Sequence, residues 1–343
     1  MKTEPWARPT DLFILRTGGC AMRKKALIGA LLLVAGCATA GNPTTSTTTP
    51  TTTSTTVEVT TTITADDAFP VTVAGDNGEV TIERRPERIV SLSSVATEIL
   101  FAIGAGDQVV AVDDQSNYPA EAPMTDLSGF TPNIEAIISY SPDLVVVSYD
   151  PGDLVAGLEA VGVPVLLQLA ANDIDGTYGQ IEVLGAATGH VAEAAAVVAG
   201  IKSDLQAIVA EVGDRAEGLT YFHEIDDNLY TFTSDTFFGQ VYGLFGLVSI
   251  ADDADPDGFG YPMLASEYIV SRDPDLIFLA DSTYGVTIET LAARPGWNAL
   301  SALQEGRVFP IDADIASRWG PRVVDFARAV GDAVRALETE PTG

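Results

Sequence analysis

The stretch NIEAIISYSPDLVVVS at residues 133–148 is repeated, in altered form, as SEYIVSRDPDLIFLA at residues 266–280. Glu135 is matched by Glu267, and Pro142 is matched by a second proline, each 132 positions later. In both copies a helical pattern ends at the proline and leads into an apolar run that is typical of a buried strand. The repeat therefore predicts one helix–strand unit in each of two similar halves of the chain.

Strand and helix patterns alternate on both sides of this repeat, which is typical of an α/β fold with parallel strands. The apolar run at residues 88–92 predicts a buried strand, and the helical pattern that follows it ends at Gly104. Residues 191–212 carry apolar side chains at helical spacing, interrupted only by Gly200. This pattern predicts a helix roughly 34 Å long. The simplest architecture is two Rossmann-like α/β lobes joined by that helix.

The first residues have the pattern of a secretory signal sequence and are not expected to be part of the folded body. Basic residues 23–25 precede an apolar run at residues 26–35, which is too short to span a bilayer as a helix. The run ends in LVAGC at Cys37, and this ending resembles the lipobox of bacterial lipoproteins, in which the cysteine is diacylated. An ordinary secretory signal with a chance cysteine is the alternative. Residues 1–36 are expected to be the signal sequence, and Met22 is the expected start of translation.

The next segment, residues 37–65, is dominated by Thr, Pro and Ser and has little apolar surface to bury. We expect it to be a disordered tether between a lipid at Cys37 and the folded body. The body is expected to divide into an N-terminal lobe at residues 66–188, a bridging helix at 189–213 and a C-terminal lobe at 214–343.

Composition excludes several classes of function. The chain has 48 acidic and 18 basic residues, and this balance argues against a nucleic-acid partner, which requires a basic surface. The folded body contains no cysteine, and its only histidines are His190 and His223, so we expect no direct metal site and no cysteine nucleophile. Neither a G-x-S-x-G motif nor a P-loop is present, so we expect no enzymatic activity.

Several ordered segments together resemble the substrate-binding proteins of ABC importers for iron-siderophores, haem and cobalamin. They include RIVSLSSVATEILFAIGAGDQVVAVDDQSNYPAEA, PNIEAIISYSPDLVVV and ARPGWNALSALQEGRVFPIDADIASRWGPRVVDFARAV, within residues 86–338. The resemblance implies a ligand cleft between two lobes that one rigid helix bridges.

It also implies a monomeric receptor without a cofactor of its own, held by its lipid on the outer face of the cell membrane. The receptor would deliver a small-molecule metal chelate to a permease dimer with ATPase subunits. An iron-siderophore is the first ligand expected, with cobalamin or haem as alternatives. A surface hydrolase or reductase on the same fold, and an adhesion or sensory module, remain as other classes of function.

The resemblance also assigns roles to particular residues. Glu135 and Glu267 are expected to dock on the two permease subunits, whereas the residues alone also allow both acids to complement helix N-termini. Ligand contacts are expected in the loops at the carboxyl ends of the strands. The candidates are Ser93, Ser94, Tyr118, Phe130, Tyr149, Phe237, Phe238, Tyr261, Tyr284, Arg318 and Trp319.

Two of these candidates carry a specific expectation. Arg318 is the residue expected to meet an anionic ligand group, because a guanidinium binds carboxylate or catecholate oxygens in a fork. Arg322 is expected to start the last helix and to pair structurally. Trp319 either covers one face of the ligand or packs between the lobes.

Overall fold

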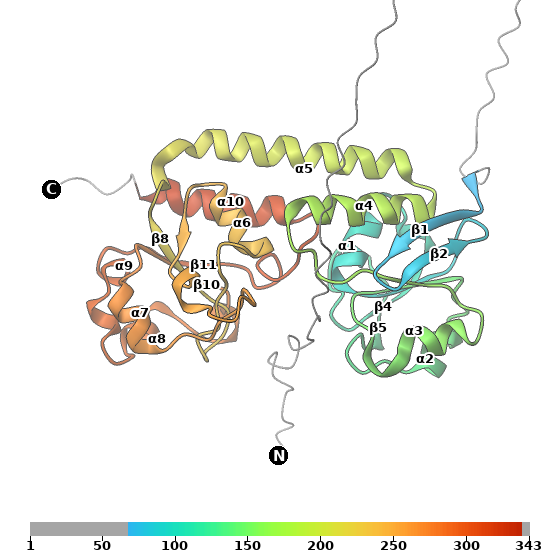
Figure 1. Ribbon diagram of the computed structural model, residues 1–343, viewed down its shortest axis with the longest axis horizontal. Coiled ribbons are helices and arrows are strands. Elements are labelled where there is room, and N and C mark those ends of the chain that lie inside the picture. The colour runs from blue at the N-terminus through green and yellow to red at the C-terminus, as the bar shows by residue number, and fades with distance from the viewer. Residues whose placement is uncertain (1–67, 338–343) are drawn as a thin grey trace, which may run out of the picture. The chain divides into compact units, whose positions relative to one another are not determined.

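The computed structural model describes residues 68–337, whose helices and strands are shown in Figure 1. The expected signal sequence, Cys37 and the Thr-rich tether fall outside the described residues. Within residues 68–337, none of the helices combines the length and the apolar character that crossing a membrane requires.

The N-lobe, as we call the first half of the described chain, is built on a five-stranded parallel sheet with the order β5-β4-β3-β6-β7. Strands β3 (Ile89–Leu92) and β6 (Leu144–Val147) are buried along their whole length, which explains their nearly continuous apolar sequences. The strands are β3 (Ile89–Leu92), β4 (Val109–Asp113), β5 (Met124–Leu127), β6 (Leu144–Val147) and β7 (Val165–Leu167), and the helices beside them are α1 (Ser94–Ala102), α2 (Ile134–Ser139) and α3 (Leu154–Glu159).

The C-lobe, the half that follows the long helix, has a four-stranded parallel sheet with the order β11-β10-β8-β9. Its strands are β8 (Thr220–Glu224), β9 (Val248–Ser249), β10 (Leu276–Leu279) and β11 (Val308–Pro310), and its helices are α6 (Phe237–Gly243), α7 (Ser266–Arg272), α8 (Ile288–Ala292), α9 (Ser301–Gln304) and α10 (Val323–Ala336). Short 3-10 turns are η3 (Gly106–Gln108), η4 (Pro151–Asp153), η5 (Gly213–Ala216), η6 (Asp252–Ala254), η7 (Ser282–Tyr284) and η8 (Trp297–Ala299).

The sequence repeat occupies equivalent positions in the two sheets. The order β4-β3-β6-β7 corresponds to β9-β8-β10-β11, so the repeated strands β6 and β10 lie at the same place. Both repeated helices end at a non-glycine residue with positive φ, Ser141 at 52° and Asp273 at 44°. The repeated aspartates, Asp143 and Asp275, also accept equivalent hydrogen bonds from backbone N–H groups at the start of a neighbouring strand. Asp143 accepts backbone hydrogen bonds just before β3, and Asp275 accepts one from Thr220 at the start of β8.

A layer of three helices connects the lobes. Helix α5 (Val191–Val212) has 22 residues and packs against α4 (Ile174–Thr188) and α10 (Figure 1). The predicted bridging helix is therefore present, and the fold of two α/β lobes with one long helix is confirmed. The sequence patterns did not predict α4. Its close packing on α5 depends on Gly185, whose Cα lies against the methyl group of Ala194.

An N-terminal hairpin covers the outer edge of the N-lobe sheet. Strands β1 (Val71–Gly75) and β2 (Gly78–Ile82) pair antiparallel. The Asn77 side chain in their turn accepts from the Leu167 N–H and donates to the Val165 carbonyl. The amide thus takes the place of a neighbouring strand on β7, and this protects an edge that would otherwise expose unpaired backbone groups.

Candidate ligand site and docking helices

The carboxyl ends of the two sheets face each other. Asn117, which follows β4, donates to Asp314, which follows β11, with 2.8 Å between Nδ2 and Oδ2. Gln240 on α6 donates to the carbonyl of Asn172, which follows β7, at 3.3 Å. Because ligands of open parallel sheets bind outside the carboxyl ends of the strands, the loops between these contacts form the candidate ligand site.

Exposed aromatic side chains lie on this site from both lobes. Tyr118 is 47% exposed and Phe130 is 51% exposed in the N-lobe, while Phe259 and Tyr284 are 71% and 82% exposed in the C-lobe. All four follow the carboxyl end of a strand, as expected for Tyr118, Phe130 and Tyr284. Large apolar groups left in water at one edge of a fold are typical of a binding surface.

Two further exposed apolar side chains at these edges were not expected from the sequence. Leu169 follows β7 and is 45% exposed, and Met263 lies in the long segment after β9 and is 61% exposed. A single aliphatic residue in a loop has no pattern that distinguishes a rim position from a core position. Only the fold identifies these two.

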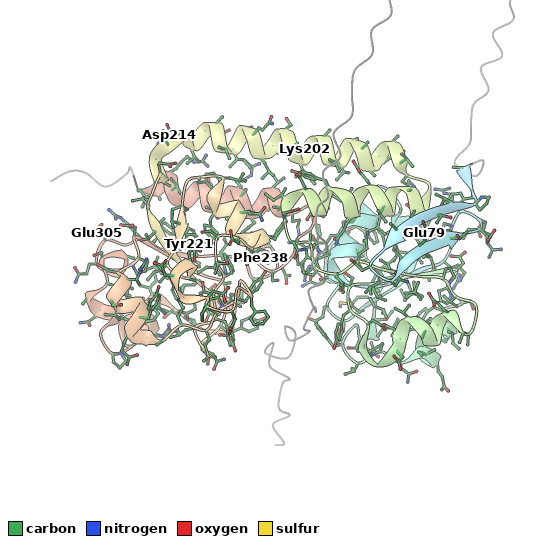
Figure 2. The ribbon with its side chains drawn as sticks, viewed as in Figure 1. Glu79, Lys202, Asp214, Tyr221, Phe238 and Glu305 are labelled. Carbon is green, nitrogen blue, oxygen red and sulfur yellow. The ribbon has the colours of Figure 1, made fainter. Side chains whose placement is uncertain are left out.

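Four of the expected ligand residues are instead buried: Arg318, described below, and Ser93, Phe237 and Phe238. Phe237 is 2% exposed and Phe238 is 7% exposed, and their rings pack edge to face inside the C-lobe, where Figure 2 labels Phe238. Thr236 caps α6, and this places the two phenylalanines on the inward side of the first turn. Ser93 is 4% exposed, and its hydroxyl accepts the N–H of Ala96 as the N-cap of α1. Ser93, Phe237 and Phe238 therefore support the fold and offer no surface to a ligand in this structure.

Four further expected residues, Ser94, Tyr149, Tyr261 and Trp319, are half-buried. Ser94 begins α1, and Tyr149 follows β6. Tyr261 packs its ring on Phe232 with 6.5 Å between centroids, and burial raises the pKa of its phenol to about 12. Tyr261 is therefore a neutral hydrogen-bonding phenol at ordinary pH.

Arg318 is held in a buried ion-pair cluster between the lobes. Its Nη1 lies 2.8 Å from Glu98 on α1, and its Nη2 lies 2.9 Å from Asp314. Arg322 donates to the same Glu98 at 2.7 Å and lies over the Tyr118 ring, 4.4 Å from its centroid. The Arg318 side chain is only 7% exposed. The structure thus pairs Arg318 with protein carboxylates, whereas the sequence predicted an anionic ligand group, and Arg322 pairs structurally as predicted.

Trp319 connects the same segment to α4. Its Nε1 donates to Gln180 Oε1 at 3.1 Å, and its carbonyl accepts from Thr177 Oγ1 at 2.8 Å. Since α4 belongs with the N-lobe, the indole packs between the lobes, which is one of the two expected roles. Contact with a ligand stays a prediction.

A buried acid pair at the carboxyl end of the C-lobe sheet was not recognised from the sequence. Glu224 ends β8 and forms a bidentate pair with Arg294 at 2.6 and 2.7 Å. Asp281, just past β10, is 2% exposed, and neither carboxyl oxygen has a hydrogen-bond donor from the described protein groups. Burial, followed by repulsion from Glu224, raises the pKa of Asp281 to about 7. The only signal in the sequence was the position of both acids at strand ends.

The two repeat glutamates occupy matching exposed positions. Glu135 is in the first turn of α2, whose N-cap Asn133 accepts from the N–H of Ala136. Glu267 is in the first turn of α7, where the Trp297 indole donates to Ser266. Both glutamates are exposed to solvent. Their docking role stays a prediction.

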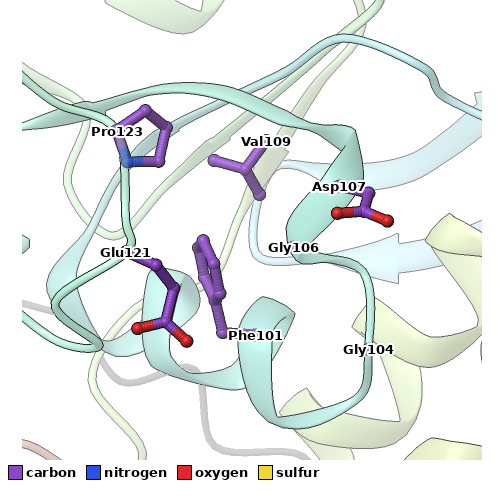
Figure 3. Close-up of a pocket in the computed structure, with 7 residues that line it drawn as sticks. All are labelled: Phe101, Gly104, Gly106, Asp107, Val109, Glu121 and Pro123. Atoms are coloured by element: carbon purple, nitrogen blue, oxygen red, sulfur yellow. The ribbon is translucent and has the colours of Figure 1, made fainter.

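Two hollows in the N-lobe lie away from this site, at the amino edge of the sheet. One has a volume of about 520 Å³ and is shown in Figure 3, where Phe101 fills the space beside Gly106. The other, of about 730 Å³, lies beside His190 and Arg85, and burial together with Arg85 lowers the pKa of His190. None of the expected ligand residues lines either hollow.

The second histidine is also part of the interior. His223 lies in β8, its Nδ1 is 2.9 Å from the hydroxyl of Tyr242, and complete burial lowers its pKa to about 3. Across residues 68–337, no three His, Cys, Asp or Glu side chains are grouped so as to hold a metal ion.

Two parallel α/β lobes, joined by one long helix and facing each other across exposed aromatic loops, define a two-lobed solute-binding protein. The chain belongs to the periplasmic binding protein family, whose sequence pattern matches residues 89–315. Members of this kind are non-catalytic substrate-binding proteins of ABC transporters for siderophores, haem or cobalamin. The predicted receptor class and the absence of enzymatic activity are thereby confirmed.

Named relatives fall in the same class. The chain is 32% identical to the ABC transporter substrate-binding lipoprotein YvrC of Bacillus subtilis over 278 residues, 78% of this chain and 86% of the relative. It is 31% identical to a cobalamin-binding protein of Halobacterium salinarum over 269 residues, 75% of this chain and 72% of the relative.

A solved structure has the same arrangement. The periplasmic vitamin B12-binding protein BtuF of Vibrio cholerae superposes with a TM-score of 0.61 at 26% identity, covering 74% of this chain and 98% of that one. A possible iron-binding solute-binding protein of Staphylococcus epidermidis gives 0.63 at 26% identity, covering 72% and 98%.

Proposed function

We propose that this protein captures a metal chelate, with a corrinoid as the first candidate, between its two lobes and delivers it to an ABC permease. The observation that carries the proposal is the set of exposed aromatic side chains at the strand ends of both lobes, Tyr118 and Phe130 in the N-lobe and Phe259 and Tyr284 in the C-lobe. Flat apolar rings with a few polar neighbours suit the faces of a macrocycle. The cobalamin-binding relatives support the same choice.

A ferric siderophore, the first ligand expected from the sequence, is the second candidate. A hydroxamate chelate also presents an apolar shell, and the similarity to a possible iron-binding protein of Staphylococcus epidermidis supports an iron chelate. The two candidates differ in size and in the groups they display, so direct binding distinguishes them.

Delivery would use Glu135 and Glu267, one on each lobe. The two carboxylates are exposed at equivalent positions of a repeated helix, and this suits a receptor made of two similar subunits. A diacylated Cys37 would hold the protein at the outer face of the membrane, and residues 37–65 would let it reach the permease. The lipoprotein relative supports this location.

Titration of residues 61–343, which form one compact unit, tests the ligand. Cyanocobalamin, a ferric trihydroxamate and haem would be added while tryptophan fluorescence is followed. This unit contains Trp297, which is fully buried, and Trp319, which lies between the lobes. We expect cyanocobalamin to quench Trp319 with a Kd below about 10 μM, equivalent to roughly −7 kcal/mol. Weaker binding by every chelate would refute the proposed function.

Charge reversal tests delivery. Glu135→Arg combined with Glu267→Arg should abolish uptake in cells that carry the cognate permease, while the Kd for the chelate stays unchanged. Glu79→Arg combined with Glu305→Arg is the matched control, with one exposed acid reversed on each lobe (Figure 2). If the Glu135→Arg, Glu267→Arg double variant still supports uptake, these glutamates are not required for docking.

A further inference from the structure

The loops of the candidate site carry a strong excess of negative charge. They contain fourteen acidic residues and only two basic ones, Arg318 and Arg322. The loops are those at residues 114–120, 128–133, 148–153, 168–173, 225–236, 250–265, 280–287 and 311–322. A surface lined with one sign of charge sets a potential that repels ligands of the same sign.

Both arginines are already neutralised by protein carboxylates. Arg318 and Arg322 share Glu98, which is 2% exposed, and Asp314 is a second partner of Arg318. To bind an anionic ligand, Arg318 would have to leave Glu98. A carboxylate buried without its partner is strongly unfavourable, so this exchange opposes the binding of an anion.

Two other cations that contact these loops or lie beside them are likewise committed. Arg272 on α7 pairs with Asp253 at 3.1 Å. Arg294 makes both of its short contacts with Glu224, while Asp281 beside them has no cation of its own. The C-lobe edge therefore holds two acids for one guanidinium. It adds no positive charge for a ligand.

We propose that the site selects metal chelates that are neutral or cationic and rejects polyanionic ones. This inference rests on the proposed function and narrows its ligand class. It favours uncharged corrinoids and neutral or cationic ferric hydroxamates over tricatecholates and over haem with its two propionates. The exposed aromatic side chains would attract a chelate through apolar contact, and the acidic loops would repel chelates that carry negative charge.

Ligands matched in shape test the inference in the full chain, purified in detergent micelles. One set is cyanocobalamin and its derivatives with one or more peripheral amides hydrolysed to carboxylates. The second set is a cationic ferric trihydroxamate, a neutral one and a ferric tricatecholate. We expect each added negative charge to weaken binding at least threefold at 20 mM salt. Raising the salt to 500 mM should reduce this loss, because screening acts on exposed charges.

A variant tests whether the loops cause the discrimination. Asp314→Asn removes one acid at the site, and the affinity ratio of an anionic to a neutral chelate should rise about threefold to tenfold. The ratio is the readout because a general change in the site alters both affinities alike. Asp204→Asn is the control, since it removes the same charge from an exposed position of α5.

The outcomes separate this inference from the proposed function. A tricatecholate or a carboxylated corrinoid that binds as tightly as its neutral counterpart would overturn the charge selection alone. An unchanged ratio in Asp314→Asn would do the same. Absence of binding by chelates of every charge would overturn the proposed function, and the inference with it.

Discussion

At the scale of single residues, the structure replaces an expected ligand contact with an internal one. Arg318 follows a strand end and its guanidinium was a natural partner for a ligand anion. The side chain instead meets Glu98, 220 positions earlier in the chain. Since both groups are buried, each is stable only because the other is present.

Asp281 gives a prediction about pH. The pKa of its carboxyl is raised from an ordinary value of 3.8 to about 7, so the folded state binds a proton that the unfolded state has released. The stability this proton contributes is complete below about pH 4 and is lost as pH rises to about 7. Asp281→Asn removes the titrating group and keeps a donor for Glu224.

We therefore expect the free energy of unfolding of the variant, relative to that of the wild type, to increase by about 2–3 kcal/mol as the pH rises from 5 to 8. Urea unfolding at a series of pH values measures the difference. Asp204→Asn on exposed α5 should show no such trend. A constant difference across the range would mean that Asp281 does not hold a proton in the folded protein.

At the scale of elements, two glycines in neighbouring helices behave differently because their surroundings differ. Gly200 lies on the exposed face of α5, and a Cβ added there meets nothing within 4 Å. Gly185 in α4 faces α5, and a Cβ there would approach the Ala194 methyl to 2.4 Å. The first glycine weakens its helix, whereas the second permits helix packing.

Gly200→Ala should raise the free energy of unfolding by about 0.5–1 kcal/mol, because alanine has the higher helix propensity. Gly185→Ala should lower it by roughly 1–3 kcal/mol, because the helices must move apart. Chemical denaturation of both variants checks the signs. Shifts in the same direction would contradict the packing of α4 on α5.

At the scale of the described body, one apolar cluster runs through both lobes. It includes Ile89 of the N-lobe sheet, Leu184 of α4, Ile201 of α5 and Phe326 of α10. The N-lobe and C-lobe also have smaller clusters of their own on the other faces of the sheets. The three-helix layer is therefore a shared core and not a flexible linker.

A shared core predicts that the lobes unfold together. Hydrogen exchange of peptides from β3 and from β8 should report the same free energy of opening, equal to that of global unfolding. Far-UV circular dichroism and Trp297 fluorescence should likewise give coincident transitions. Exchange that is more than tenfold slower in one lobe would show that the lobes unfold independently.

Much of the architecture could be predicted from sequence because it depends on local patterns. The repeat at residues 133–148 and 266–280 fixed one helix–strand unit per lobe, and helical spacing predicted α5. Helix α4 was missed although residues 173–189 contain both of its boundary signals, since Asp173 caps it and Gly189 ends it. The exposed positions of Glu135 and Glu267 follow from the same repeat.

The candidate site was less predictable, since exposure and pairing are set by distant parts of the chain. Sequence by itself determined two parallel α/β lobes and the loops in which the site lies, because strand and helix periodicity are properties of neighbouring residues. Only the tertiary structure decided that Phe238 is core while Phe130 is rim. It also decided that Glu98 neutralises Arg318, because lobes far apart in sequence meet there and desolvation forces their buried charges to pair.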